Sequence, residues 1–291
     1  MTPPDSQRRR AYAGAGFILA GAALIQASAA IVKPVFTEVG PAATSAWRFL
    51  IGAVVLLALT RPRLSTWRRE QWVGAVALGV TTAFMNVCFY QAFARIPLGG
   101  AVAIEYLGPC LVAALGKRTW RHFGFVLLAG AGVVALAHPG GGLTLVGSLF
   151  AAGSGLGWAG YAFASHRVGR TTSGFGGLAV SMSIAAVVTL PWSIGRASVV
   201  VSHPSVLARV GVVAVMAIVL GFGAELQALR RLSPTIVGVL LALDPAVAFA
   251  SGWLFLHQAI TSFDALGLAC VVVAGAGVTW DAASDDVPLA L

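Results

Sequence analysis

The chain has 291 residues, of which 58% are hydrophobic and 10% are charged, and its mean hydropathy is +0.87. A soluble domain of this length needs more charged side chains than these to cover its surface. The composition therefore excludes a soluble domain and predicts an integral membrane protein. The formal net charge of +9 does not indicate nucleic-acid binding, because most of the basic residues fall in the predicted loops on one side of the membrane.

Ten apolar segments along the chain approach or exceed the roughly 20 residues that an α-helix needs to cross a bilayer. Each is predicted to be a helix, because a helix satisfies its own backbone hydrogen bonds inside the hydrocarbon. The sequence therefore predicts an all-α integral membrane protein with ten transmembrane helices, at residues 11–32, 42–60, 71–93, 97–116, 121–137, 143–165, 175–195, 205–229, 233–256 and 263–280.

The basic residues predict the orientation of these helices. With the N-terminus in the cytoplasm, 14 of the 19 basic residues lie in predicted cytoplasmic segments, as the positive-inside rule expects. Both termini are therefore predicted to be cytoplasmic. The first helix resembles a secretory signal peptide at Ala27-Ser28-Ala29, but its hydrophobicity continues past that point, which favours an uncleaved first helix.

Polar residues interrupt the first four predicted helices. Gln26 either contacts a ligand or forms an interhelical hydrogen bond, and the second interpretation is favoured. Arg48 lies six residues after Ala42, so it either extends to the outer surface or belongs to a site inside the membrane. Three further polar residues follow in the third and fourth helices: Asn86, Gln91 and Glu105.

The segment 90–116 recurs 136 positions later as 226–252. Without a gap, Gln91 aligns with Gln227, and Pro109 aligns with Pro245. This repeat divides the chain into two predicted units of five helices, residues 11–137 and 143–280. Because five is an odd number, the second unit enters the membrane in the opposite orientation, which makes the pair an inverted repeat.

Each unit carries a proline in the middle of its fourth helix. Pro109, after Gly108, and Pro245 cannot donate to the carbonyl four residues earlier, so both helices are predicted to break there. Paired interruptions of this kind indicate the binding site of a transporter near the middle of the bilayer. Asp244, immediately before Pro245, lies near the same depth and is a further candidate.

Other motifs have simpler interpretations. Glu225 is close to Arg230 and Arg231 in the sequence, so a local ion pair is favoured over a role in transport. The glycines from Gly153 to Gly157 suit close helix packing, and the G-x-G-x-x-G match that overlaps them lies within an apolar helix without a preceding strand, so no dinucleotide site is predicted. The three cysteines and five histidines are scattered, and neither a metal nor another cofactor is predicted.

The interrupted helices carry the likeness to a known family. They read EYLGPCLVAALG and LALDPAVAFASG, and with residues 22–59 they resemble the EamA-type transporters of the drug/metabolite transporter superfamily, especially the bacterial threonine/homoserine exporters. Glu105, Gly108 and Pro109 match the family segment directly, whereas Asp244-Pro245 stands where that group more often has Glu-Pro. The resemblance implies export of amino acids or related metabolites.

These observations predict a monomeric or homodimeric carrier in the bacterial inner membrane. It would export a small metabolite, with an amino acid of the threonine or homoserine kind favoured, by alternating access and with protons as the candidate coupling ion. Arg48 and Glu105 lie at matching depth, so they either clamp the two charged groups of an amino acid or pair with each other permanently. The predicted substrate-binding residues are Glu105, Arg48, Gln91, Asn86, Asp244 and Gln26.

Two alternatives belong to other functional classes. A passive channel is compatible with the broken helices. An integral-membrane enzyme that acts on lipid substrates is disfavoured, because its chemistry would need clustered histidines or paired carboxylates, whereas the acidic residues here lie on separate helices.

Overall fold

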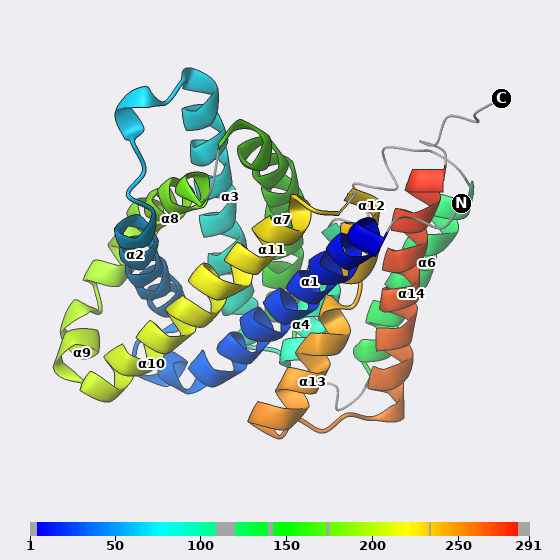
Figure 1. The fold of residues 1–291 in the computed structure, drawn as a ribbon. Coiled ribbons are helices and arrows are strands. Elements are labelled where there is room, and N and C mark those ends of the chain that lie inside the picture. The colour runs from blue at the N-terminus through cyan, green and yellow to red at the C-terminus, as the bar shows by residue number, and fades with distance from the viewer. Residues whose placement is uncertain (1–4, 109–119, 139–141, 173–174, 233, 285–291) are drawn as a thin grey trace.

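The computed structural model of the protein describes residues 5–108, 120–138, 142–172, 175–232 and 234–284. Within these ranges every regular element is a helix (Figure 1). The first half contains α1 and the short helix η1, α2 and the short helix η2, and then α3, α4 and α6, with the bounds Asp5–Val32, Lys33–Thr37, Pro41–Thr60, Leu64–Thr66, Arg69–Phe93, Leu98–Glu105 and Trp120–Leu136.

The second half begins with α7 and α8, which are long, and continues with shorter helical pieces before the final long helix α14. These elements are α7, α8, α9, α10, η3, α11, α12, α13 and α14, with the bounds Leu145–Thr171, Gly176–Ile194, Ala197–Ser202, Pro204–Ala214, Val215–Gly221, Phe222–Leu229, Pro234–Leu241, Asp244–Leu256 and Ser262–Ser284.

The lengths and compositions of these helices confirm a multi-pass membrane protein. Within the described residues, six stretches are long and apolar enough to cross a bilayer: Tyr12–Thr37, Pro41–Thr60, Arg69–Phe93, Gly176–Ile194, Pro204–Leu229 and Ile236–Leu256. Two further apolar helices are shorter, Phe123–Leu136 and Ser262–Val278. The count of ten stays a prediction, since the expected span 97–116 lies partly outside the described residues.

Local sequence signals explain several helix ends. Pro41 begins α2 and Pro204 begins α10, positions at which the missing N–H costs nothing because the first turn of a helix leaves it unpaired anyway. The chain turns into α2 through Gly40, whose φ is +85°, a value that a residue with a side chain rarely adopts. At the start of α7 the Thr144 hydroxyl accepts from the backbone N–H of Gly147 at 3.2 Å, which caps the helix.

The second repeat contains an interruption close to Pro245. α12 ends at Leu241 and α13 begins at Asp244, so the interruption falls at Ala242 and Leu243, with Pro245 in the first turn of α13. In the first repeat α4 ends at Glu105 and its cap is Tyr106, which lies 136 positions before Ala242. Pro109 itself lies outside the described residues.

α4 lies at the centre of the bundle, and all of its residues are buried. It crosses α7 at glycines. A Cβ on Gly155 would lie 2.5 Å from the carbonyl oxygen of Glu105, and one on Gly157 would lie 2.9 Å from Cα of Met85 in α3. The close packing predicted for the 153–157 stretch is thereby confirmed, and it places the middle of α7 against both α3 and α4.

Between α10 and α11 the chain forms a π-helical segment, η3. Hydrogen bonds in such a segment join residues five apart, and π turns inside α-helices often occur at functional sites. η3 packs against α1, α2 and α10. It approaches α1 closely at Gly21, where a Cβ would lie 3.1 Å from the carbonyl oxygen of Gly221.

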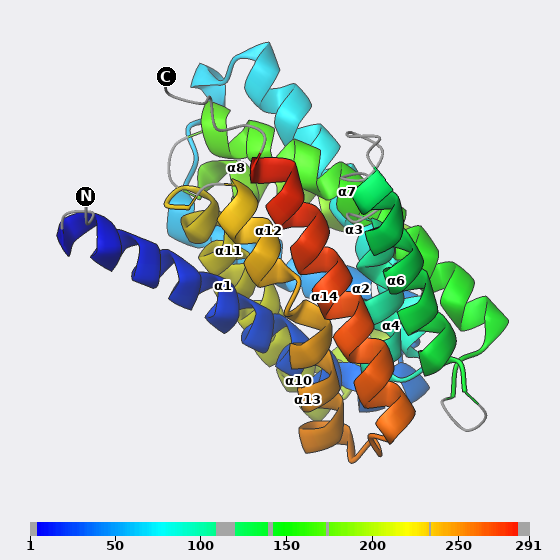
Figure 2. The same cartoon turned by 90° about the vertical axis from the view of Figure 1, so that its right-hand side faces the viewer.

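The two halves interlock rather than forming separate bodies. α2 packs on α8, α4 on α13, and α6 on α14. α3 packs on α7, and α1 packs on α10, η3 and α11. In both ribbon views the connection from α2 to α3 and the last turns of α14 lie at the upper end, whereas the connection from α13 to α14 lies at the lower end (Figures 1 and 2).

Candidate functional site

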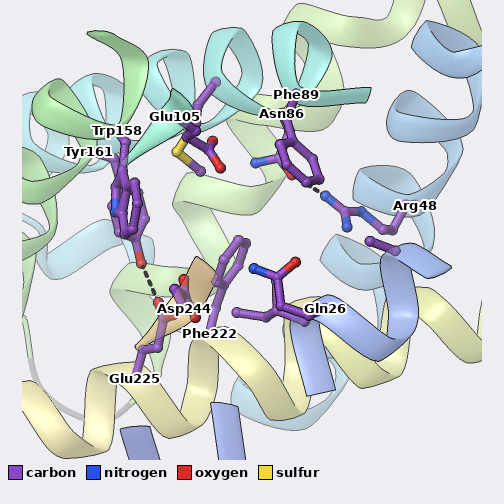
Figure 3. Close-up of a pocket in the computed structure, with 13 residues that line it drawn as sticks. Gln26, Arg48, Asn86, Phe89, Glu105, Trp158, Tyr161, Phe222, Glu225 and Asp244 are labelled. Atoms are coloured by element: carbon purple, nitrogen blue, oxygen red, sulfur yellow. Dashed lines mark hydrogen bonds between the residues drawn. The ribbon is translucent and has the colours of Figure 1, made fainter. Parts of the chain in front are cut away.

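A cavity of about 60 Å³ lies where helices from both halves meet. Its wall is formed by α1, α2, α3, α4, α7, α11 and α13 (Figure 3). At roughly 10–15 Å³ for each water molecule on this measure, it has room for about four. The polar side chains that line it are Gln26, Arg48, Asn86, Glu105, Tyr161, Glu225 and Asp244, and the aromatic ones besides Tyr161 are Phe89, Trp158 and Phe222.

Arg48 forms one side of the cavity and is 2% exposed. Its Nη2 donates to Oδ1 of Asn86, and the Asn86 amide in turn donates to the carbonyl of Thr82 at 3.0 Å. The guanidinium lies 4.7 Å from the centre of the Tyr90 ring, within the range of a cation–π interaction. Its Nε has no hydrogen-bond partner, so this buried cation keeps donor capacity for a ligand.

The other side of the cavity is acidic. Glu105 from α4 accepts a hydrogen bond from the hydroxyl of Ser154, and Glu225 from α11 accepts one from the hydroxyl of Tyr161 at 3.2 Å. Asp244 is buried at the start of α13, and its Oδ1 has no hydrogen-bond partner. Three carboxyl groups thus face one cavity with a single guanidinium.

This arrangement suits a small molecule with one anionic and one cationic end. The Arg48 guanidinium can donate two parallel hydrogen bonds to a carboxylate, and the acidic side can accept from an ammonium group. Buried ionisable groups without a partner are costly inside a membrane and mark functional sites by default. The aromatic rings between the two sides would exclude water from the rest of the ligand.

The structure brings five of the six predicted substrate-binding residues to the cavity: Gln26, Arg48, Asn86, Glu105 and Asp244. Gln91 does not reach it, because the side chain of Arg95 holds both its backbone oxygen at 2.6 Å and its amide oxygen at 2.7 Å. The break residues lie beside the site, with Gly108 buried against Gly155 and Pro245 next to Asp244.

Three sequence-based interpretations need correction. Arg48 and Glu105 are not a permanent pair: the first is bound to Asn86, the second to Ser154. The interhelical bond favoured for Gln26 is absent at its Oε1, which is buried without a partner. Glu225 contacts Tyr161 instead of the expected arginines.

Those arginines have other contacts in the structure. Arg231 donates to the backbone oxygen of Gln227 at 2.7 Å and lies over the ring of Phe17. Arg230 donates to the carbonyl of Thr172 at 3.4 Å. The side chain of Glu225 therefore lines the cavity instead of pairing with either arginine.

Sequence reasoning missed Tyr161 and Trp158 as cavity residues and disfavoured Glu225. A signal for Glu225 was present in the repeat. The offset of 136 aligns Asn86 with Phe222 and Phe89 with Glu225, and all four line the cavity. Extending the repeat alignment a few residues toward the N-terminus would have indicated Glu225.

The described residues contain no group of three or more histidine, cysteine, aspartate or glutamate side chains placed to hold a metal ion. Cys88 and Cys270 carry free thiols, and Cys110 lies outside the described residues.

The sequence model of the EamA-like transporter family matches residues 12–137 and 145–280. The chain belongs to the EamA-like transporter family. It is 32% identical over 250 residues to the threonine/homoserine exporter RhtA of Escherichia coli K12 and, equally, to that of Salmonella typhimurium LT2, with 85% of this chain and 84% of each relative covered. It is also 23% identical over 249 residues to the uncharacterized transporter YvbV of Bacillus subtilis, with 80% of both chains covered.

A solved structure titled "Crystal structure of protein" has the same fold, with a TM-score of 0.62 at 21% identity over 94% of this chain and 99% of the other. As a member of the EamA-like transporter family with these relatives, the protein is a membrane transporter of small molecules and not an enzyme.

Proposed function

We propose that this EamA-like transporter exports an amino acid from the cytoplasm across the bacterial inner membrane by alternating access, with protons as the coupling ion. The observation that carries the proposal is the cavity in which one buried guanidinium lies across from three carboxyl groups. The RhtA relatives are threonine/homoserine exporters, which supports the same substrate class.

In the proposed complex the carboxylate of the substrate binds Arg48 beside Asn86, and its ammonium group binds Glu105 and Asp244. The free Nε of Arg48 and the free Oδ1 of Asp244 are the groups with unused hydrogen-bonding capacity on the two sides. Gln26, whose Oε1 is also free, would accept from a hydroxyl on the substrate side chain. A substrate that satisfies these buried atoms gains more affinity than one that leaves them unpaired.

The cavity must widen to admit such a substrate, since room for about four water molecules is less than the volume of an amino acid. The interruptions at Tyr106 and at Ala242–Leu243 are the proposed hinges. Each adjoins a carboxyl group of the site, Glu105 in α4 and Asp244 in α13. Bending at either break would therefore move a binding residue and open a path on one side of the membrane.

We also propose that the fold is a ten-helix inverted repeat with both termini in the cytoplasm. The contacts between helices agree with this symmetry. The packing of α3 from the first half on α7 from the second corresponds to the packing of α10 and α11 from the second half on α1 from the first. The pairs α2–α8, α4–α13 and α6–α14 each join two corresponding helices. The basic connection from α2 to α3 lies at the same end as the last turns of α14 (Figure 1), which agrees with a cytoplasmic C-terminus.

Proton coupling follows from the excess of acidic groups. A zwitterionic substrate brings one ammonium group to three carboxyl groups, so an acid of the site can hold a proton while the substrate is absent and bind the ammonium group once it is ionised. Glu105 is the favoured one, because its side chain and its backbone carbonyl both lie at the break in α4. The hydroxyl of its neighbour Ser154 donates to it, and a carboxyl oxygen can accept such a bond in both protonation states.

The test is uptake into inside-out vesicles, in which export appears as accumulation in the lumen. With an acidic lumen, threonine or homoserine should accumulate saturably in vesicles that contain the protein. Glu105→Gln should abolish proton-driven accumulation at normal expression. Glu38→Gln, the same change at an exposed residue between η1 and α2, is the matched control.

Three outcomes would contradict the proposal. Failure to accumulate any amino acid at normal expression would refute the substrate class. Uptake that neither saturates nor concentrates would favour the passive channel. Normal accumulation by Glu105→Gln would remove Glu105 from the coupling mechanism.

A further inference from the structure

A second recess lies on the surface of the bundle, between α3 and the C-terminal part of α7. It is an open groove of about 540 Å³ and shares no residue with the central cavity. Arg167 and Arg170 line one end, and Val73, Ala77 and Phe163 line the rest. Phe163 is 71% exposed and Val73 is 48% exposed, so this groove opens toward the lipid that surrounds the protein.

Two observations place the basic end of the groove at the level of the lipid headgroups. Trp67 and Trp72 contact each other at the beginning of α3 with ring centroids 5.4 Å apart, and tryptophan is enriched at the membrane–water interface. The Gln71 amide donates to the carbonyl of Thr171 at 3.0 Å, which fixes the last turn of α7 at the height of the first turn of α3.

The apolar part of the groove extends from that level into the hydrocarbon. At 1.5 Å per residue, Ala77 lies about 9 Å deeper than Gln71, and Gly160 lies about 15 Å deeper than Arg170. A depth of this size accommodates a large part of one acyl chain. The groove therefore combines a charged rim with an apolar channel of matching direction.

The charges at the rim have unused binding capacity. Arg167 and Arg170 are three residues apart on one helix, so their side chains are neighbours about 5–6 Å apart at Cβ. Both are exposed, and in the described part of the chain neither guanidinium has an ion pair or a hydrogen bond. Two adjacent guanidiniums match a phosphate group. Glu70 is the one acidic residue among those that line the groove.

We propose that this groove binds a phospholipid whose headgroup carries a primary ammonium, as in phosphatidylethanolamine. The phosphate lies between Arg167 and Arg170, the ammonium faces Glu70, and one acyl chain follows Val73, Ala77 and Phe163. Two cations beside one carboxylate complement a zwitterionic headgroup. A purely anionic headgroup would leave Glu70 without a partner, and a quaternary ammonium could not donate a hydrogen bond to it.

The experiment measures lipid binding to the purified, delipidated full-length chain in detergent. Phosphatidylethanolamine, phosphatidylglycerol and phosphatidylcholine with identical acyl chains are titrated, and bound lipid is counted by native mass spectrometry. Phosphatidylethanolamine should bind more tightly than the other two. The double change Arg167→Gln with Arg170→Gln should weaken its binding about tenfold or more, since each charge-assisted contact contributes substantially. Arg63→Gln, at an exposed arginine of the same end outside the groove, should leave binding unchanged.

Glu70→Gln supplies a readout that misfolding cannot imitate. The change keeps the size of the side chain but removes the charge that opposes an anionic headgroup, so binding of phosphatidylglycerol should strengthen while that of phosphatidylethanolamine weakens. Soluble glycerophosphoethanolamine should compete poorly, because it lacks the acyl chain that the apolar channel binds.

Equal affinity for the three lipids would overturn the proposal, as would a double variant that behaves like Arg63→Gln. None of these measurements involves transport, so the lipid site and the proposed export function can fail separately.

Discussion

Tyr161→Phe removes a single hydroxyl from the central cavity. That hydroxyl donates to Oε2 of Glu225 at 3.2 Å, while the ring, which would remain, lies 6.0 Å from that of Phe222. A hydrogen bond contributes about 0.5–1.5 kcal/mol between neutral groups and about 1.5–3 kcal/mol when the acceptor is charged. Since 3.2 Å is long for an O–H···O contact, we expect a loss of about 1.5 kcal/mol in the free energy of unfolding.

Tyr90→Phe is the matched control. The Tyr90 side chain is 1% exposed and its hydroxyl has no hydrogen-bond partner, so the same chemical change there removes an unsatisfied buried group. The phenylalanine ring would still lie under the guanidinium of Arg48. We therefore expect stability that is unchanged or higher.

Equilibrium unfolding in mixed detergent micelles, followed by circular dichroism, measures both variants. The reasoning is refuted if Tyr161→Phe is as stable as the wild type, or if Tyr90→Phe loses as much as Tyr161→Phe. A transport assay on the same preparations adds a second comparison. If Glu225 takes part in coupling, Tyr161→Phe should slow proton-driven accumulation, whereas Tyr90→Phe should not.

The remaining predictions concern packing, hinges and topology. Gly155→Ala should destabilise the protein by about 1–3 kcal/mol, because the new Cβ would lie 2.5 Å from the Glu105 carbonyl oxygen. Gly130→Ala, where nothing lies within 4 Å, should be neutral or stabilise by up to about 1 kcal/mol in the same unfolding assay, and equal losses would contradict this account. Pro245→Ala should restore a backbone N–H near the break and slow transport without preventing insertion; a normal transport rate would make the break a packing feature only. Reporter fusions after Gly142 and Gly169 should be periplasmic and cytoplasmic respectively; the reverse pattern would refute the cytoplasmic termini, and fusions on the same side would contradict the predicted span between them.

The cost of burying polar groups made much of the site predictable. Arg48, Glu105 and Asp244 interrupt long apolar segments, and a membrane tolerates such residues chiefly where they meet a cavity or one another. Proline chemistry likewise predicted the break that the structure has at Ala242 and Leu243. Both arguments depend only on composition and on position along one helix.

Direction around the helix axis was harder to predict. Gln91 precedes Arg95 by four residues, which places both on one face, so the arginine holds the amide away from the cavity. Glu225 precedes Arg230 by five residues, a rotation of about 140° at 100° per residue. The two residues are close in the sequence, which suggested an ion pair, but their side chains lie on opposite faces of the helix and do not meet.

The contacts between side chains of different helices could not be predicted from the sequence. Depth in the membrane predicted Arg48 and Glu105 at similar levels, and both line the central cavity, but depth does not determine which neighbour each side chain meets. Asn86 and Ser154 take those places because the glycines of α7 allow α3, α4 and α7 to approach closely. No local pattern in α2 or α4 contains that information.

The π-helical segment η3 changes the effect that a one-residue deletion would have. A π turn holds an additional residue compared with an α turn, so removing one residue from 215–221 would restore a regular helix between α10 and α11. Residues after that point would rotate by about 100° relative to those before it, and Glu225 would turn away from the cavity. Hydrophobicity, charge and span length would hardly change. Within this family, the number of carboxyl groups in the site can therefore evolve by insertion and deletion in an apolar segment, without any substitution of an acidic residue.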